Sequence, residues 1–241
     1  AYPLRFFMIS TPLWMLLLFV VGLSVVLFRM SKPGEQFHQW IRMLLFLAAA
    51  AFPWIYILII QPAIHDGLRH VLFAVPPLII LMAYGADSAF RLIERNSAAL
   101  RLPALGLGIG LVLFQVHSLY RMHPYQYVSF NILAGHRATI PNRYDTEYWC
   151  TSSRHLLEAL PDVVESKPSP DNPTKIRVSG ALDAARPFVP EGFVLTDSFD
   201  EAAYYVSNTN FRIDAIVDGE VLYQITRGGI PIGVIKKLDS R

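Results

Sequence analysis

The sequence predicts an α-helical membrane bundle of four transmembrane helices followed by a small extracytoplasmic α/β domain. Hydrophobic residues make up 53% of the 241 residues and charged residues only 17%, which is too apolar for an ordinary soluble protein. The charges are also unevenly distributed. Residues 1–120 carry eight Lys or Arg and four Asp or Glu, whereas residues 121–241 carry thirteen and fifteen. We therefore expect a transmembrane domain over 1–120 and a soluble α/β domain over 121–241.

The first half contains four apolar runs, each close to the length that crosses a hydrocarbon layer of about 30 Å as a helix. The expected spans are about 11–28, 43–60, 71–86 and 103–120. Pro53 lies inside the second span, where neighbouring helices can satisfy the carbonyl group that it frees. Pro76 and Pro77 lie in the middle of the third span and predict a kink. Three glycines in the fourth span predict a thin face for close helix approach: Gly106, Gly108 and Gly110.

The basic residues predict the orientation of these spans. They concentrate in two loops, after the first span at Arg29, Lys32 and Arg42, and after the third span at Arg91, Arg95 and Arg101. Loops rich in Lys and Arg stay in the cytoplasm. The loop over 61–70 holds a single basic residue other than histidine, so we expect it to face outside. The soluble half then faces outside as well.

The second half shows the alternation and the turn residues of a small α/β domain. A helix capped by Ser152 or Ser153 carries apolar residues at helical spacing and is expected to stop at Pro161. A linker with three prolines follows over 167–174. The expected strands lie around 176–178, 193–195 and 203–206, followed by a hairpin of 221–226 and 230–235 around Arg227-Gly228-Gly229.

The charges and the cysteine count exclude some classes of partner and site. A net charge of +2 with interspersed signs gives no basic stripe for nucleic acid, so nucleic acid is not an expected partner. The single cysteine, Cys150, cannot form an internal disulfide. Two acidic groups could hold a divalent cation or act as acid and base, with solvated loops as the alternative. These groups are Asp145 with Glu147, and Asp197 with Asp200 and Glu201.

A polar run, His65-Asp66-Gly67-Leu68-Arg69-His70, separates the second and third spans and must lie at a membrane face. Charges near a bilayer are costly, so such a cluster indicates a function. Arg69 presents a planar fork that suits the phosphate of a lipid carrier, and His65 or His70 could add a hydrogen bond or a proton. The alternative is that Arg69 only extends to the interface or pairs with Asp66.

This run and its continuation into Val75-Pro76-Pro77-Leu78 resemble a late transmembrane segment of bacterial relatives of dolichyl-phosphate-mannose protein mannosyltransferases. The run from His123 to Val128 with Phe130-Asn131, and the run from Asp145 to Trp149, resemble the segment that follows the last helix in those proteins. The chain departs from this pattern at Cys150, where the relatives carry glycine. The likeness covers most of the sequence.

The resemblance implies a membrane glycosyltransferase of the GT-C class, which transfers a sugar from a polyprenyl-phosphate donor on the extracytoplasmic side of the membrane. For this chain it implies a bacterial inner membrane with the soluble half on the periplasmic or external side. The lipid-phosphate site would comprise Arg69, His65, His70 and Asp66. The candidates for an acceptor site or an interface are His123, Tyr125, Gln126, Asp145, Tyr148 and Trp149. The acidic catalytic residue of this class is expected upstream of Ala1, on a missing N-terminal half or a partner membrane protein.

A second class of function stays open on the sequence alone. The chain could be a non-catalytic membrane subunit or scaffold whose four helices anchor a small external domain that binds a partner protein. A transporter is less expected, because the four spans contain no internal acidic or basic residue that would bind an ion.

Overall fold

The computed structural model describes residues 2–31, 37–165 and 168–238, so Lys32 and Lys167 of the predictions above lie outside the described residues. The chain forms two compact units, each with its own interior. The first comprises Ala1–Tyr120 and Phe130–Leu133, and the second comprises Arg121–Ser129 and Ala134–Arg241. The second unit therefore begins at Arg121, the position of the predicted domain boundary. A short segment beyond this boundary, Phe130–Leu133, belongs to the first unit.

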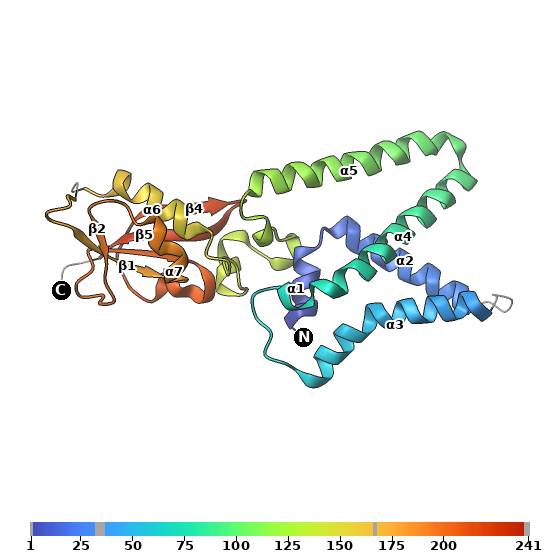
Figure 1. Cartoon of the computed structure of the whole chain (residues 1–241). Helices are drawn as coiled ribbons and strands as arrows, with labels where there is room; N and C mark the ends of the chain where they lie inside the picture. The colour runs from blue at the N-terminus through green and yellow to red at the C-terminus, as the bar shows by residue number, and fades with distance from the viewer. Residues whose placement is uncertain (1, 32–36, 166–167, 239–241) are drawn as a thin grey trace. The chain divides into compact units, whose positions relative to one another are not determined.

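The first unit is helical (Figure 1). Its elements are α1 (Tyr2–Ser10), α2 (Leu13–Met30), α3 (Phe37–Ile60), η1 (Arg69–Ala74), α4 (Val75–Asn96), η2 (Ala98–Leu100) and α5 (Arg101–Met122). Among the residues that the structure describes, four stretches are long and apolar enough to cross a membrane: Leu13–Met30, Phe37–Ile60, Arg69–Asn96 and Ala98–Met122. The chain is therefore a membrane protein by the length and composition of its helices.

Pro53 lies inside α3 as expected. Two other details of these helices differ from the sequence-based predictions. The kink predicted at Pro76 and Pro77 is wrong, because both prolines occupy the first turn of α4, where the missing N–H groups would have no helical partner in any case. The short helix α1 was not anticipated, and it buries Phe6, Phe7 and Ile9.

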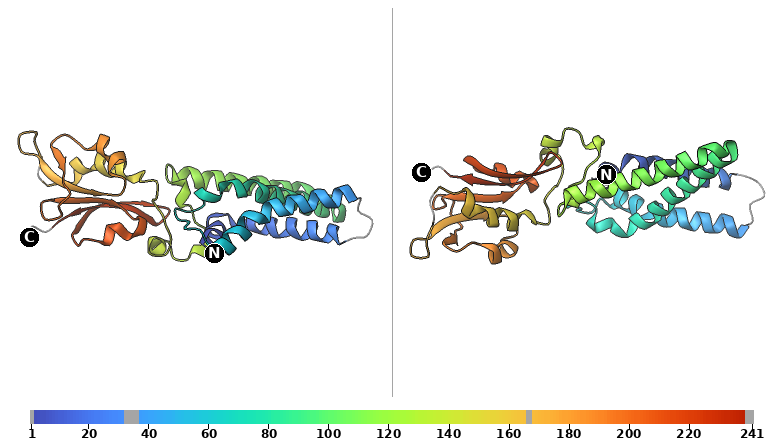
Figure 2. Two further views of the ribbon diagram at one scale, coloured as in Figure 1. Left: turned by 60° about the horizontal axis from the view of Figure 1, so that its bottom comes forward. Right: turned by 90° about the horizontal axis from the view of Figure 1, so that it is seen from above.

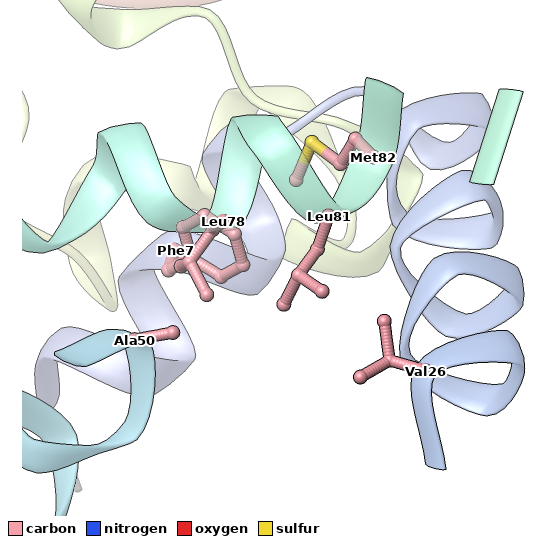
Figure 3. Packing of buried hydrophobic residues seen from close by; sticks show 6 residues of the cluster. All are labelled: Phe7, Val26, Ala50, Leu78, Leu81 and Met82. Atoms are coloured by element: carbon pink, nitrogen blue, oxygen red, sulfur yellow. The ribbon is translucent and has the colours of Figure 1, made fainter. Parts of the chain in front are cut away.

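The interior of the first unit lies between α1, α2, α3 and α4, as Figure 3 shows with Phe7, Val26, Ala50, Leu78, Leu81 and Met82. The closest approach of two helices depends on Gly22 of α2 and Gly85 of α4. A Cβ atom on Gly22 would overlap the carbonyl oxygen of Leu81, and one on Gly85 would overlap that of Leu18. These two glycines let the backbones of α2 and α4 meet, which is the usual role of small residues between membrane helices.

The glycine face predicted on α5 does not have this role. A Cβ atom on Gly106, Gly108 or Gly110 would have no atom within 4 Å. None of the most apolar window of α5 is buried inside the structure. The prediction of close packing at these glycines is therefore wrong within the described part of the chain.

A return segment, Phe130–Leu133, completes the first unit. The Phe130 ring lies edge-on to Phe6 at 5.5 Å between centroids. The backbone N–H of Asn131 donates to the Ile9 carbonyl at 2.7 Å, and its side-chain amide donates to the carbonyls of Met8 and Thr11 at 2.7 and 2.6 Å. Asn131 thus satisfies carbonyl groups at the end of α1 that have no partner within the helix.

The second unit is built on a five-stranded mixed sheet in the order β2-β1-β3-β5-β4. The strands are β1 (Thr174–Ser179), β2 (Phe193–Leu195), β3 (Tyr204–Asn208), β4 (Glu220–Arg227) and β5 (Ile230–Lys237). Strand β1 runs parallel to β2 and β3, whereas β5 runs antiparallel to β3 and β4. The strands lie side by side in both views of Figure 2. All five residues of β3 are buried, as expected for a central strand.

The other elements of the second unit are η3 (Gln126–Val128), η5 (Arg137–Asn142), α6 (Ser152–Val163), α7 (Leu182–Ala185), η6 (Arg186–Phe188) and η7 (Asn210–Ala215). The short turn η4 (Ile132–Ala134) spans the boundary, with Ile132 and Leu133 in the first unit and Ala134 in the second. Helix α6 buries Leu156, Leu157 and Leu160 on the sheet, and a Cβ atom on Gly233 of β5 would come within 2.8 Å of the Leu156 side chain. The Tyr205 hydroxyl of β3 donates to the Ile213 carbonyl in η7 at 2.5 Å.

The predicted elements of this unit are present, with changes at their ends. Thr151 rather than Ser152 precedes the first turn of α6, and neither serine caps it through a side-chain hydrogen bond. Pro161 lies within α6, which continues to Val163. The closing hairpin has a two-residue turn, Gly228-Gly229, with φ of 54° and 80° at the two glycines. Positive φ at both positions is what a tight hairpin turn requires.

Candidate functional site

The polar run between α3 and η1 turns sharply at Asp66 and Gly67, whose φ angles are 59° and 71°. Glycine adopts this left-handed conformation freely, and Asp tolerates it better than most residues. The backbone N–H of Gly67 donates to the Tyr2 hydroxyl at 2.9 Å. Helix α1 therefore holds the loop at its turn, a role that the sequence alone did not indicate.

Asp66 organises the side chains of this loop. Asp66 is only 9% exposed. Its Oδ2 atom lies 2.6 Å from Arg69 Nη2 and 3.0 Å from His65 Nδ1. Arg69 Nη2 also lies 3.3 Å from His65 Nδ1, so the three side chains form one cluster. Arg69 Nε donates to His70 Nε2 at 3.2 Å, and the two imidazole rings lie 5.5 Å apart.

The geometry shows Arg69 paired with Asp66, which is one of the alternatives for this residue. Arg69 remains accessible to a ligand, because 32% of its side chain is exposed, as is 55% of the neighbouring His65 side chain. An anionic group that approaches Arg69 therefore meets a guanidinium whose orientation is already fixed by Asp66 and His70.

An apolar cavity of about 430 Å³ lies beside this cluster and includes His70 in its wall. Its other lining residues come from the end of α3, the loop and η1: Phe52, Pro53, Tyr56, Ile57, Pro62, Ala63, Ile64, Val71 and Phe73. The four residues of the phosphate-site prediction thus lie together, and one of them, His70, borders a space that suits a hydrocarbon chain.

The second group of candidate residues lies in the second unit and does not form one cluster. Gln126 and His123 form an exposed hydrogen bond at 2.9 Å. Tyr125 is fully buried, and its hydroxyl oxygen lies 2.5 Å from Nδ1 of His155. Burial raises the pKa of Tyr125 to about 12. Tyr125 is thus part of the interior.

Glu147 is the polar centre of the same region. The Tyr127 hydroxyl and the Ser152 backbone N–H donate to its Oε1 atom, the latter at 3.1 Å. Its Oε2 atom and the Ser152 hydroxyl are buried without a hydrogen-bond partner in the described structure. Burial raises the pKa of the Glu147 carboxyl, and burial followed by the charge of Glu147 raises the pKa of the Tyr127 hydroxyl.

Tyr148 and Trp149 extend this aromatic region toward the surface. The Tyr148 ring lies 5.3 Å from that of Tyr127 and 5.8 Å from that of Trp149, which is 56% exposed. Asp145 is half-buried. An exposed tryptophan beside a tyrosine is a plausible contact for a sugar or a protein surface.

The acidic groups considered for a cation have other partners. Asp197 pairs with Arg177 at 2.5 Å, and Glu201 pairs with Lys175 at 2.9 Å. Among the residues that the structure describes, no three His, Cys, Asp or Glu side chains are grouped to hold a metal ion.

Cys150 adopts a left-handed backbone conformation, which glycine favours, and glycine is the residue that the family pattern would place at this position. Its φ is 54°, in the left-handed region. Its Sγ atom accepts hydrogen bonds from the Asn208 side chain at 3.2 Å and from the Ala181 N–H at 3.3 Å. These contacts hold the turn that leads from Trp149 into α6.

Sequence reasoning missed two residues of these sites, Tyr2 and His155. Both act through contacts between distant positions, and neither belongs to a recognisable local pattern. Comparison with family models, curated proteins and solved structures gave no match for this chain.

Proposed function

We propose that this membrane protein is part of a glycosyltransferase that binds the phosphate of a polyprenyl-phosphate sugar at the His65–His70 loop. The observation that carries the proposal is the position of Arg69. Its guanidinium is oriented by Asp66 and His70, partly exposed, and next to an apolar cavity of about 430 Å³ whose wall includes His70. A phosphate on a lipid needs both a cationic group at head-group level and an apolar path for its chain.

The chemistry of sugar transfer gives these residues distinct roles. When the sugar leaves, the lipid phosphate gains negative charge, and an oriented cation stabilises that charge more than it stabilises the bound donor. Arg69 supplies the charge and the fork of donors. His65 and His70 can donate a hydrogen bond or a proton to a phosphate oxygen. Asp66 is a positioning residue, because it holds Arg69 and His65 and faces the interior.

The proposal places the loop and the second unit on the extracytoplasmic side, the periplasmic or external side of a bacterial inner membrane. The support is the distribution of basic residues, which concentrate near the end of α2 and the start of α3, and near the end of α4 and the start of α5. Trp149 and Tyr148 are then candidates for the acceptor surface.

The test is sugar transfer from a polyprenyl-phosphate donor by the protein in its membrane, normalised to folded protein. Arg69→Ala alone would leave the buried Asp66 carboxylate with one partner fewer, so a fall in activity could reflect folding. The variant of choice is Asp66→Asn with Arg69→Gln. It removes both charges and leaves two neutral amide side chains, and Asn tolerates the φ of 59° at position 66.

We expect this double variant to fold and to transfer sugar about tenfold to a hundredfold more slowly, because a charged hydrogen bond contributes roughly 1.5 to 3 kcal/mol. Arg69→Lys should lie between it and the natural protein, because lysine keeps the charge and loses the fork. Transfer at the natural rate in the double variant would contradict the phosphate-binding role and favour a scaffold that binds a partner protein.

A further inference from the structure

A second cavity, of about 410 Å³, lies between α2, α3 and α4. Its lining includes five apolar residues, which we call its floor: Val26, Met43, Phe46, Ile80 and Leu81. It also includes four residues with polar groups: Arg29, Arg42, Gln39 and Tyr84. The cavity is therefore amphipathic, with two guanidinium groups and an apolar floor.

The arginines of this cavity are available for an anion. Arg29 lies over the Tyr84 ring at 5.5 Å from its centroid, a cation–π contact that directs the guanidinium without neutralising it. Within residues 2–31, 37–165 and 168–238, neither Arg29 nor Arg42 forms an ion pair with a carboxylate. Arg91 and Arg101, by contrast, pair with carboxylates nearby.

The cavity and the His65–His70 loop lie at the two ends of α3. Arg42 is in the second turn of this helix and Ile60 is its last residue. The rise between them is about 27 Å, close to the roughly 30 Å thickness of a hydrocarbon core. A membrane that places the loop at one head-group level therefore places the two arginines near the other.

We infer that this cavity binds an anionic phospholipid, with the phosphate between Arg29 and Arg42 and an acyl chain along the floor at Ile80 and Leu81. The Gln39 amide and the Tyr84 hydroxyl can add neutral hydrogen bonds to the phosphate or to the glycerol part of the head group. Basic pockets between membrane helices bind such head groups. The tendency of arginines to remain in the cytoplasm explains their presence at this end, but it does not require them to share one cavity with an apolar floor.

The experiment measures lipid retention by the purified whole chain. The protein is reconstituted in nanodiscs of phosphatidylcholine with a minor fraction of phosphatidylglycerol, and bound lipids are counted by native mass spectrometry after extraction into detergent. The natural protein should retain phosphatidylglycerol in preference to phosphatidylcholine. Arg29→Gln and Arg42→Gln should each lower this retention about fivefold, and the double variant about twentyfold.

Two controls separate this site from general surface charge and from misfolding. Arg95→Gln removes the same charge from α4 outside the cavity and should leave retention unchanged. Ile80→Trp keeps every charge and fills the floor, and Ile80 is 56% exposed, so the larger ring can be accommodated in the fold. It should lower retention of phosphatidylglycerol as the arginine variants do.

Three results would overturn the inference. One is equal retention by the natural protein and the double arginine variant. Another is an equal loss in Arg95→Gln, which would indicate non-specific attraction to an anionic surface. The third is displacement of the lipid by inorganic phosphate in excess, which would indicate a site for a free anion. Persistence of the lipid under excess phosphate, together with its loss in Ile80→Trp, supports the lipid site.

Discussion

Gly22→Ala should destabilise the helix bundle through a single methyl group. The added Cβ atom would overlap the carbonyl oxygen of Leu81 on the facing helix, which is backbone and cannot rotate away. Relief requires α2 and α4 to separate locally by on the order of 1.5 Å. A gap of that size removes much of the van der Waals attraction around Val26, Leu81 and their neighbours.

The expected magnitude follows from overpacking in a dense interior. Such substitutions cost about 1 to 3 kcal/mol, and for a chain of this length each kcal/mol lowers the melting temperature by about 2 to 4 °C. We therefore expect Gly22→Ala to melt roughly 2 to 12 °C below the natural protein. Gly85→Ala should behave similarly, and the two effects should add incompletely because both open the same contact.

The matched control is Gly108→Ala in α5. A Cβ atom there would meet no atom within 4 Å, so the same chemical change carries no overlap. Its melting temperature should stay equal or rise slightly, because alanine favours the helix over glycine. The assay is thermal unfolding of the purified chain in one detergent at one scan rate. Equal shifts in Gly22→Ala and Gly108→Ala would refute the assigned contact between α2 and α4.

Three further predictions concern the second unit. Burial raises the pKa of Glu147 above its ordinary value of 4.5, so the contribution of this carboxyl to stability is full below pH 4.5 and is lost as the pH rises through the folded-state pKa. The melting temperature of Glu147→Gln should therefore rise relative to that of the natural protein as the pH rises. A difference in melting temperature that stays constant with pH would contradict this. Gly228→Ala places a side chain at a φ of 54° and should cost about 1 kcal/mol, visible as a lower melting temperature; an unchanged melt would argue against the assigned turn. Ser169→Cys in a Cys150→Ser background should react with a membrane-impermeant thiol reagent in intact cells, and reaction only after lysis would reverse the proposed orientation.

The long helices could be predicted because span length and hydropathy are properties of local sequence. Helix packing could not be predicted in the same way. Gly106, Gly108 and Gly110 look like a packing face, yet Gly22 and Gly85 make the close contact, because a glycine allows approach only where a partner backbone lies opposite. That partner depends on how the helices are arranged, which no local pattern specifies.

The same distinction applies to the polar loop. The sequence places Asp66 three residues before Arg69, so their pairing is a local event that the sequence made conceivable. The support from Tyr2 depends on a helix that is distant along the chain. In the second unit, Glu147 looked like half of a surface acidic pair. Its burial follows from the packing of Tyr127 and α6 around it.

The central claim is that the His65–His70 loop binds a lipid phosphate through Arg69, and binding of a polyprenyl phosphate measures it most directly. The purified chain in phosphatidylcholine nanodiscs is titrated with a polyprenyl monophosphate and, in parallel, with the corresponding polyprenyl alcohol. The natural protein should bind the phosphate at least about tenfold more tightly than the alcohol, and this preference should disappear in Asp66→Asn with Arg69→Gln while binding of the alcohol is unchanged. Equal affinity of the natural protein for the two lipids, or an undiminished preference in the double variant, would contradict it.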